Sequence, residues 1–508
     1  MKNILNKNEQ RILLFSVFIL SLCGIIYELV LGSLASYLLG NPVQQYSITI
    51  GVFLSSMGLG SYLSRFFEKE LLRTFVRVEI ALGLVGGLSV IILNYLFSFS
   101  ASFYALHVFF LTIIGTLVGL EIPLLTRILK SYGALKDIIS SVLTLDYIGG
   151  LAGSLLFPLI LFPYAGRFLT SLLVGMINII VAVYVILMIK NYRDRRKDIA
   201  FAIISLLILM VLALNSDWIN AILQKKMFYD DIVFSRRSKY QEIVLTRSGD
   251  DFRLYLDGSL QFSTSDEYRY HEMLVYPAIL SSQTDVSRIL VMGGGDGLAV
   301  REILKFNSVQ SVTLVELDGF MVDLAKNNST LKMINVNSLL NPKVEVVIGD
   351  AYDYLIRNRN GFDVIIADFT DPHDETISKL YTVEFFKLVK RSLKPGGIFV
   401  TQSTSSLFAR DAFWCINKTM SMAFKNVYPY HVFIPAFGDW GFNMASDIQL
   451  EIDNNRMNKA RGKFYSREIL LASTIFPDDS SKIDTDTNTF NRPVLYKYYL
   501  KGWKNSDY

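Results

Sequence analysis

Residues 289–297 read Ile-Leu-Val-Met-Gly-Gly-Gly-Asp-Gly, and this stretch decides the fold expected for the second half of the chain. The short run of apolar residues predicts a buried strand. The glycines that follow allow a tight turn and a close approach of the backbone to a ligand. A strand that leads through such a turn into a helix is typical of an open α/β sheet, which binds ligands at the carboxyl ends of its strands.

The same alternation of strand and helix continues to about residue 424. Beside Ile289–Met292, the expected strands are Val312–Glu316, Val344–Ile348, Asp363–Ala367 and Ile398–Gln402, and the expected helices lie near 297–306, 318–327, 351–358, 379–393 and 408–424. This alternation predicts a parallel sheet with right-handed crossovers. The last two apolar runs, 430–434 and 440–445, are joined by too few residues for a crossover helix. They should form an antiparallel hairpin, as in the methyltransferase-like variant of the doubly wound Rossmann-type sheet.

A small antiparallel β unit is expected before this sheet. The segment from Tyr240 to Phe262 alternates with period two and turns at Asp257-Gly258, a dipeptide typical of two-residue hairpins. The soluble part of the chain is therefore α/β with an added β unit.

The first part of the chain has the composition of a membrane domain. Seven apolar stretches come close to the length of about 20 residues that a bilayer requires. They are 12–39, 44–64, 75–97, 102–125, 138–163, 168–190 and 199–214. We therefore expect a multi-helix transmembrane domain over 1–215, with the β unit over 216–285, the Rossmann-like domain over 286–450 and a C-terminal extension over 451–508.

The distribution of Lys and Arg predicts how this domain is oriented. Positive residues cluster before the first stretch and then in every second connection, which places the N-terminus in the cytoplasm of a multi-pass protein of the cell membrane. The first apolar run is too long for a cleavable signal peptide. If the stretch 199–214 spans, the soluble half lies outside the cytoplasm. If that stretch is re-entrant or interfacial, the soluble half is cytoplasmic, as the supply of a nucleoside substrate favours.

Three carboxylates, Glu28, Glu121 and Asp146, lie inside the apolar stretches. An ionised carboxylate in this setting is costly unless it is paired or reaches a polar cavity. Two interpretations remain open: a polar pathway for a cationic amine, or structural pairing with Ser, Thr or Tyr on neighbouring helices.

Other features limit the classes of partner. The net charge of +4 is small and is not gathered into one stripe, so nucleic-acid binding is not supported. The two cysteines, Cys23 and Cys415, indicate neither a disulfide framework nor a metal site. No cluster with metal-ligand spacing is found in the sequence, and no metal is expected.

Polar residues follow three successive strands at the edge where a nucleoside would bind. Asp296 lies in the glycine turn between Gly293 and Gly297, Glu316 ends the next strand, and Asp350-Ala351 follows the third. An acidic residue about 20 positions after such a turn meets ribose hydroxyls in nucleotide-binding folds, and a carboxylate after the third strand can accept a hydrogen bond from an adenine amino group. Together these residues predict a nucleoside site that includes Gly293 and Gly295.

The charge of Asp296 indicates which nucleoside. A carboxylate in the turn would repel the carboxylate of S-adenosylmethionine and attract the ammonium of its decarboxylated form. The fourth strand ends in Asp368-Phe369-Thr370-Asp371. An alkylamine of about Lys-like pKa 10.4 is protonated at neutral pH, so its attack on carbon requires a group that binds it and takes its proton. Asp368 is the candidate base and Asp371 the candidate amine anchor.

These residues, in this order and spacing, resemble the spermidine synthase family of polyamine aminopropyltransferases over about 240–446, and the membrane half is similar to its multi-pass membrane subgroup. The resemblance rests on Tyr240-Gln241, Leu256-Asp257-Gly258, Tyr270-His271-Glu272, Gly293–Gly297, Val315–Asp318, Gly349-Asp350 and Asp363–Pro372. It implies that Gln241, Glu316 and Asp350 hold the thioadenosine moiety, that Asp296 binds the aminopropyl ammonium, and that Tyr270, His271 and Asp371 line the channel for the acceptor amine. It also implies a homodimer or higher homo-oligomer, and a co-substrate, decarboxylated S-adenosylmethionine, in place of a cofactor.

One segment departs from the family. Soluble members carry a longer Pro-Thr-Tyr-Pro segment, whereas Pro435–Trp440 is shorter and lacks the tyrosine. Putrescine is the expected acceptor, and a longer polyamine, another diamine or agmatine remain open. Two other functions also remain open at this point, namely methyl transfer from S-adenosylmethionine and a polyamine transporter or sensor.

Overall fold

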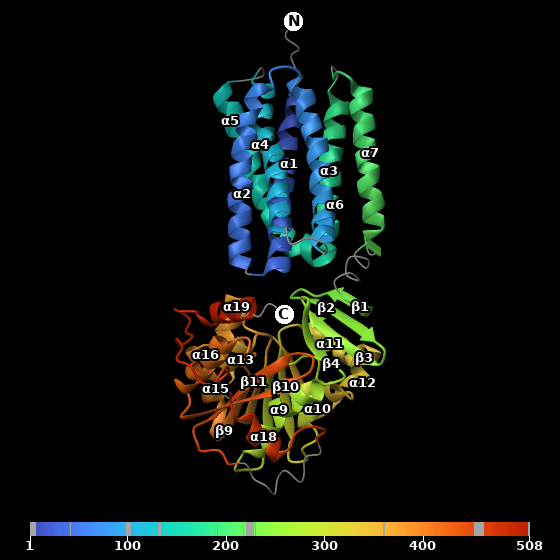
Figure 1. Ribbon diagram of the computed structural model, residues 1–508. Helices are drawn as coiled ribbons and strands as arrows, with labels where there is room; N and C mark the ends of the chain where they lie inside the picture. Colours follow the sequence, from blue (N-terminus) through green and yellow to red (C-terminus); the bar gives the residue numbers. More distant parts are fainter. Residues whose placement is uncertain are drawn as a thin grey trace. The chain divides into compact units, whose positions relative to one another are not determined.

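The computed structural model describes residues 7–40, 42–97, 103–130, 134–189, 192–216, 218–219, 228, 230–358, 361–451 and 462–505. They form two compact units that divide between Asp231 and Ile232. The first unit consists of helices and the second is α/β (Figure 1). The predicted fold class is confirmed.

Seven helices make up the described part of the first unit. They are α1 (Lys7–Leu39), α2 (Pro42–Leu63), α3 (Leu71–Phe97), α4 (Phe103–Leu129), α5 (Leu135–Leu156), α6 (Phe162–Met188) and α7 (Arg195–Leu214). Six helical stretches are long and apolar enough to cross a membrane, with α5 and α6 counted as one stretch. A π turn at Phe157–Leu161 joins these two helices, and the chain kinks at Gly166, whose φ of 65° favours glycine.

Helix α7 runs parallel beside α3. Near the start of both helices, the Asp198 carboxylate accepts hydrogen bonds from Nε of Arg73 at 3.1 Å and of Arg77 at 2.9 Å. About three turns further along, a side chain at Gly87 of α3 would lie 2.9 Å from Leu209 of α7. These contacts show that α7 runs beside α3 over about three turns.

The buried carboxylates of this unit include one that the sequence analysis did not single out. Glu79 of α3 is 0% exposed and Glu121 of the neighbouring helix α4 is 5% exposed. Both carboxylate oxygens of Glu79, Oε1 of Glu121 and the hydroxyl of Tyr27 are buried with no hydrogen-bond partner among the described residues. Glu28 and Asp146 are only partly buried. Pairing with Ser, Thr or Tyr therefore does not account for these atoms of Glu79 and Glu121.

The second unit begins with a four-stranded antiparallel meander. Its strands, in the order β1-β2-β3-β4, are Asp231–Arg237, Glu242–Ser248, Asp251–Leu256 and Ser259–Ser263. Asp257 and Gly258 join β3 to β4 with φ of 46° and 82°, as a two-residue hairpin turn of type I′ requires. The predicted β unit and its turn are confirmed. Strand β1 was not predicted, because its residues do not alternate cleanly and most remain exposed.

The main sheet has seven strands in the order β10-β11-β9-β8-β5-β6-β7. The parallel strands are β5 (Arg288–Gly293), β6 (Ser311–Glu316), β7 (Val344–Ile348), β8 (Phe362–Asp368) and β9 (Leu393–Gln402), followed by the antiparallel hairpin β10 (Asn426–Ile434) and β11 (Gly438–Ser446). The five predicted strands and the hairpin are confirmed. The strand order reverses between β5 and β8, and this is where such sheets bind ligands.

Helices cover this sheet. They are α9 (Glu267–Leu280), α10 (Leu298–Ile303), α11 (Gly319–Asn327), α12 (Ser329–Ile334), α13 (Ala351–Arg357), α14 (Glu375–Ser378), α15 (Val383–Ser392), α16 (Arg410–Ser421), α18 (Arg467–Ser473) and α19 (Leu495–Asn505). The helix predicted over 379–393 begins later, because the Thr382 hydroxyl caps α15 by accepting from Phe385 N. A short helix and a 3-10 turn occupy the preceding residues.

Candidate active site

The glycine turn after β5 is held against the end of β8. Gly293, Gly294 and Gly297 all have positive φ, between 69° and 83°. A Cβ atom at Gly293 would lie 2.2 Å from the carbonyl oxygen of Asp368. Only glycine allows this approach, so the turn and the aspartate at the end of β8 are fixed relative to each other.

Asp296 presents its carboxylate from this turn. Its Oδ1 accepts a hydrogen bond from the backbone N–H of Leu298 at 2.9 Å, at the start of α10. Burial raises the pKa of Asp296, and the nearby charge of His271 opposes that rise. The carboxylate is thus partly desolvated and would gain from a cation beside it.

Glu316, at the end of β6, is fixed by backbone donors. Its Oε2 accepts from Gly295 N at 3.1 Å and its Oε1 from Asp318 N at 2.9 Å. Burial raises the pKa of Glu316 to about 7. Gln241, which directly precedes β2 of the small sheet, donates through Nε2 to Oδ2 of Asp318 at 3.0 Å. The small sheet is therefore tied to the edge where Glu316 lies.

Asp350 begins α13, and both of its oxygens are engaged. Oδ1 accepts from Tyr352 N at 2.7 Å, and Oδ2 lies 2.8 Å from Nζ of Lys379. Burial alone would raise the pKa of Asp350, but the hydrogen bond and charge of Lys379 outweigh it and hold the pKa below its ordinary value. Ala351, the next residue, is buried at the first position of α13. Lys379 was not predicted near this site.

Asp368 ends β8 with its carboxylate held by a tyrosine. The hydroxyl of Tyr270, on α9, donates to Oδ1 of Asp368 at 2.7 Å. The other oxygen, Oδ2, faces the glycine turn, where a Cβ atom at Gly294 would lie 2.8 Å away. Burial raises the pKa of Asp368 to about 6, while His271 and Tyr270 oppose the rise. The predicted base and the predicted channel tyrosine are therefore in direct contact.

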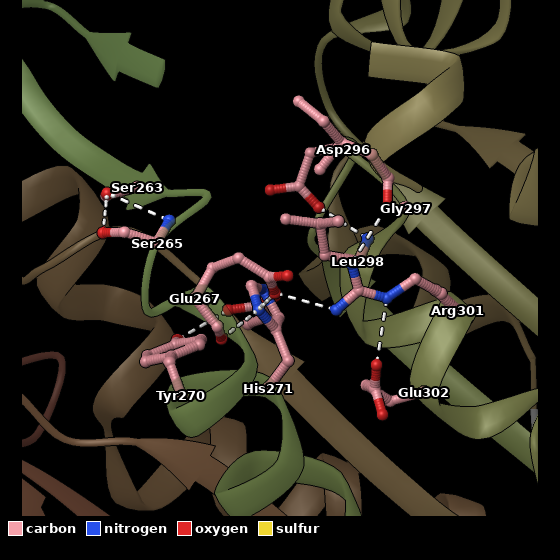
Figure 2. Close-up of polar contacts among 12 residues, drawn as sticks. Ser263, Ser265, Glu267, Tyr270, His271, Asp296, Gly297, Leu298, Arg301 and Glu302 are labelled. Carbon is pink, nitrogen blue, oxygen red and sulfur yellow. Dashed lines mark hydrogen bonds and ion pairs between the residues drawn. The ribbon is translucent and has the colours of Figure 1, made fainter. Parts of the chain in front are cut away.

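His271 lies beside these carboxylates but bonds away from them. It is 2% exposed, and its Nδ1 lies 2.8 Å from Oε2 of Glu267, which also accepts from Arg301 at 2.8 Å (Figure 2). Burial would lower the pKa of His271, but the hydrogen bond and charge of Glu267 outweigh it and raise the pKa to about 9. The imidazole is thus a buried cation that interacts with Asp296 and Asp368.

Asp371 is contacted from the C-terminal extension. The hydroxyl of Tyr499, on α19, donates to Oδ2 of Asp371 at 3.0 Å, whereas Oδ1 is buried and has no hydrogen-bond partner within the described chain. Burial raises the pKa of Asp371 to about 6, against the hydrogen bond from Tyr499, the nearby His373 and the side chain of Gln402. Gln402 steadies the same loop by donating to the carbonyl oxygen of Phe369 at 2.9 Å. Tyr499 was not predicted here, because no local pattern connects it with a residue 128 positions earlier.

The shortened segment 435–440 presents aromatic rings near the site. The rings of Phe437 and Tyr270 are 6.4 Å apart, and those of Phe437 and Trp440 are 5.2 Å apart. Ala436 N donates to Oδ2 of Asp266 at 2.6 Å, next to the start of α9. This lip presents the aromatic rings of Phe437 and Trp440 beside Tyr270.

The predicted residues thus fall into three connected parts around the glycine turn. Gln241 and Glu316 lie on the β6 side, Asp350 lies at the start of α13, and the two aspartates of the β8 loop lie with Tyr270 on the other side. Among the residues that the structure describes, no His, Cys, Asp and Glu form a group able to hold a metal ion. The arrangement suits two cationic reactants that meet above the turn.

Comparison with known proteins gives consistent results along the chain. Residues 267–455 match the family described as the spermine/spermidine synthase domain. The chain is 41% identical over 496 residues to a polyamine aminopropyltransferase of Leptospira interrogans, with 97% of this chain and 99% of that protein covered. It is 39% identical over 507 residues to a polyamine aminopropyltransferase of Oceanobacillus iheyensis, with 98% of each covered.

A solved structure is also similar to part of this chain. It is the crystal structure of a spermidine synthase in complex with the transition-state analogue AdoDATO, which is 29% identical in sequence and superposes with a TM-score of 0.46. The similarity covers 49% of this chain and 86% of that one.

Proposed function

Because this chain belongs to the spermine/spermidine synthase family and is a polyamine aminopropyltransferase that uses decarboxylated S-adenosylmethionine as co-substrate, we propose that its acceptor is putrescine and that its products are spermidine and methylthioadenosine. Gln241, Glu316 and Asp350 would hold the thioadenosine moiety, with Gly293, Gly295 and Ala351 forming the surface beneath it. Asp296 would bind the ammonium of the aminopropyl group.

The chemistry assigned to Asp368 follows from its geometry. One amine of the diamine attacks the carbon beside the sulfonium, a carbon–nitrogen bond forms, and the carbon–sulfur bond breaks to leave a neutral thioether. The amine loses a proton, which Asp368 accepts. Tyr270 fixes one oxygen of this carboxylate and leaves the other beside the glycine turn, so the base is held in one orientation.

The observation that carries the proposal is the set of three carboxylates, Asp296, Asp368 and Asp371, around one glycine turn and one strand end. Burial raises the pKa of each of them, and each would be stabilised as an anion by a cation bound nearby. The sulfonium donor carries one ammonium and the diamine carries two. A donor with a carboxylate of its own would meet Asp296 as a like charge.

The test is direct. Purified full-length protein, incubated with decarboxylated S-adenosylmethionine and putrescine, should release methylthioadenosine and spermidine in equal amounts. Cadaverine, agmatine and spermidine in place of putrescine define the acceptor. A second amine turned over with a higher kcat/KM than putrescine would refute the assignment of putrescine, while a lack of methylthioadenosine with every amine would refute the catalytic assignment.

The position of the second unit relative to a membrane depends on α7. The first unit would lie in the lipid bilayer of the cell membrane, with its N-terminus in the cytoplasm by the positive-inside rule. The parallel course of α7 and α3 supports a spanning α7 and hence a catalytic unit on the non-cytoplasmic side, against the expectation from substrate supply. Alkaline phosphatase fused after Asp217 should be active if this is so. If the phosphatase fusion is inactive and a second fusion, of green fluorescent protein at the same site, is fluorescent, the unit lies in the cytoplasm. Assembly into a homodimer or higher oligomer stays a prediction.

A further inference from the structure

The C-terminal helix α19 lies beside α16, outside the residues that match the family domain (Figure 1). A Cβ atom at Gly502 would lie 2.6 Å from the carbonyl oxygen of Phe408 and 2.7 Å from Cα of Ala409. The helix therefore packs backbone to backbone against the segment that leads into α16. A larger residue at Gly502 would push α19 away from the unit.

Asn488 fixes the start of this helix against the active-site side of the domain. It is 0% exposed. Its Nδ2 donates to the carbonyl oxygens of Ser378 at 2.9 Å and Tyr381 at 3.1 Å, and its Oδ1 accepts from Val494 N and Leu495 N at 3.1 and 3.3 Å. A buried amide that is satisfied on both sides holds a single orientation. The position of α19 is therefore set by the same loop that follows Asp371.

The two aspartates of the β8 loop are held in the same way by two tyrosines from different parts of the chain. Tyr270, within the family domain, donates to one oxygen of Asp368, and Tyr499, outside it, donates to one oxygen of Asp371. In each case a phenol fixes the carboxylate and leaves its second oxygen without a phenolic donor. For Asp371 that second oxygen, Oδ1, is buried and makes no hydrogen bond of good geometry within the described residues, and the side chain of Gln402 lies close enough to the carboxylate to lower its pKa.

We propose that α19 forms part of the acceptor site, and that Tyr499 is a positioning residue that aims Oδ1 of Asp371 at the distal ammonium of the diamine. This inference rests on the proposed function. The lip at 435–440 carries no tyrosine hydroxyl, and Tyr499 supplies one from another part of the fold.

The experiment compares Tyr499→Phe with Tyr496→Phe, a change of the same size three residues earlier on the same helix. Calorimetry measures putrescine binding to the full-length protein in the presence of methylthioadenosine, and, separately, the binding of methylthioadenosine. Tyr499→Phe should weaken putrescine binding about tenfold, the effect of losing one hydrogen bond to a charged group, while methylthioadenosine binding changes less than twofold. Tyr496→Phe should leave both unchanged.

Turnover adds a readout that a purely structural role would not move. In Tyr499→Phe the acceptor KM should rise while the donor KM stays constant. The preference for putrescine over cadaverine should shrink, because Oδ1 of Asp371 is no longer held toward the distal ammonium. Equal behaviour of the two variants, or a loss of donor and acceptor binding together, would overturn the inference. Wild-type protein that binds putrescine without turnover would instead refute the proposed function, so the two failures are distinguishable.

Discussion

Replacement of Asp368 by Asn is the perturbation whose effect the structure defines best. The change keeps the size of the side chain and an Oδ1 atom that can accept from Tyr270, now 2.7 Å away. It removes the group that takes the proton of the attacking amine. At pH 7.4 an amine of pKa about 10.4 is neutral in about one molecule in a thousand, and a positioned base contributes about 10²–10⁴ to the rate.

We therefore expect Asp368→Asn to lower kcat about 10²–10³-fold, with the donor KM within about twofold of wild type. The assay is steady-state release of methylthioadenosine at saturating donor. In the variant the remaining rate should increase about tenfold per pH unit between 7 and 9, as the fraction of neutral amine does. The control is Tyr270→Phe, which keeps the carboxylate and should cost less. A decrease in kcat smaller than tenfold, or a pH-independent residual rate, would refute the role of Asp368.

Further expectations concern pH, packing and stability. Burial raises the pKa of Asp368 and of Asp371 to about 6, so both carboxylates are charged above that pH. Below about pH 6, log(kcat/KM) for putrescine should therefore fall with pH with a slope greater than one. In Asp371→Asn only one of the two groups remains, and the slope should return to one. Gly293→Ala should abolish turnover, because its Cβ would lie 2.2 Å from the Asp368 carbonyl oxygen, and should also lower the melting temperature; an active, stable variant would contradict the close approach. Glu79→Gln removes one of two buried carboxylates on the neighbouring helices α3 and α4, and the melting temperature in detergent should rise by about 2–4 °C for each kcal/mol of stability added; a lowered melting temperature would contradict this expectation.

The order and type of the elements in the second unit could be predicted from the sequence because the signals are local. The parallel strands are continuous apolar runs, the glycine turn follows one of them, and Asp257-Gly258 specifies a hairpin. The start of α15 was harder to predict, because the residues before Thr382 also favour a helix and only the cap determines where α15 begins.

Residues alone predict candidate site positions at strand ends, whereas Gln241, Tyr270 and His271 came only from the family resemblance. Asp296, Glu316 and Asp368 follow strands, so topology brings them together. The contacts of Lys379 with Asp350 and of Tyr499 with Asp371 depend on how distant segments pack, and neither has a local signature. His271 was predicted along the acceptor channel; its hydrogen bond to Glu267 joins positions i and i+4 of α9, whereas the ion pair of Glu267 with Arg301 on α10 depends on how the two helices pack.

The same reasoning explains the limits of prediction in the first unit. Apolar length was sufficient to find seven helices. The burial of Glu79 was not visible, because it requires knowing which face of α3 packs against its neighbours. The course of α7 beside α3, which bears on the side of the membrane, likewise follows from contacts such as Asp198 with Arg77 and not from hydropathy.

The most direct measurement is the binding of two donors, S-adenosylmethionine and its decarboxylated form, to the wild-type protein and to Asp296→Asn. Two like charges at about 4 Å repel by about 4 kcal/mol at an effective dielectric constant of 20. After allowance for solvent, wild-type protein should prefer the decarboxylated donor at least about hundredfold, and Asp296→Asn should reduce that preference to less than about tenfold. Equal binding of both donors to the wild-type protein, or a preference that survives the substitution, would contradict the claim that carboxylates select the reactants.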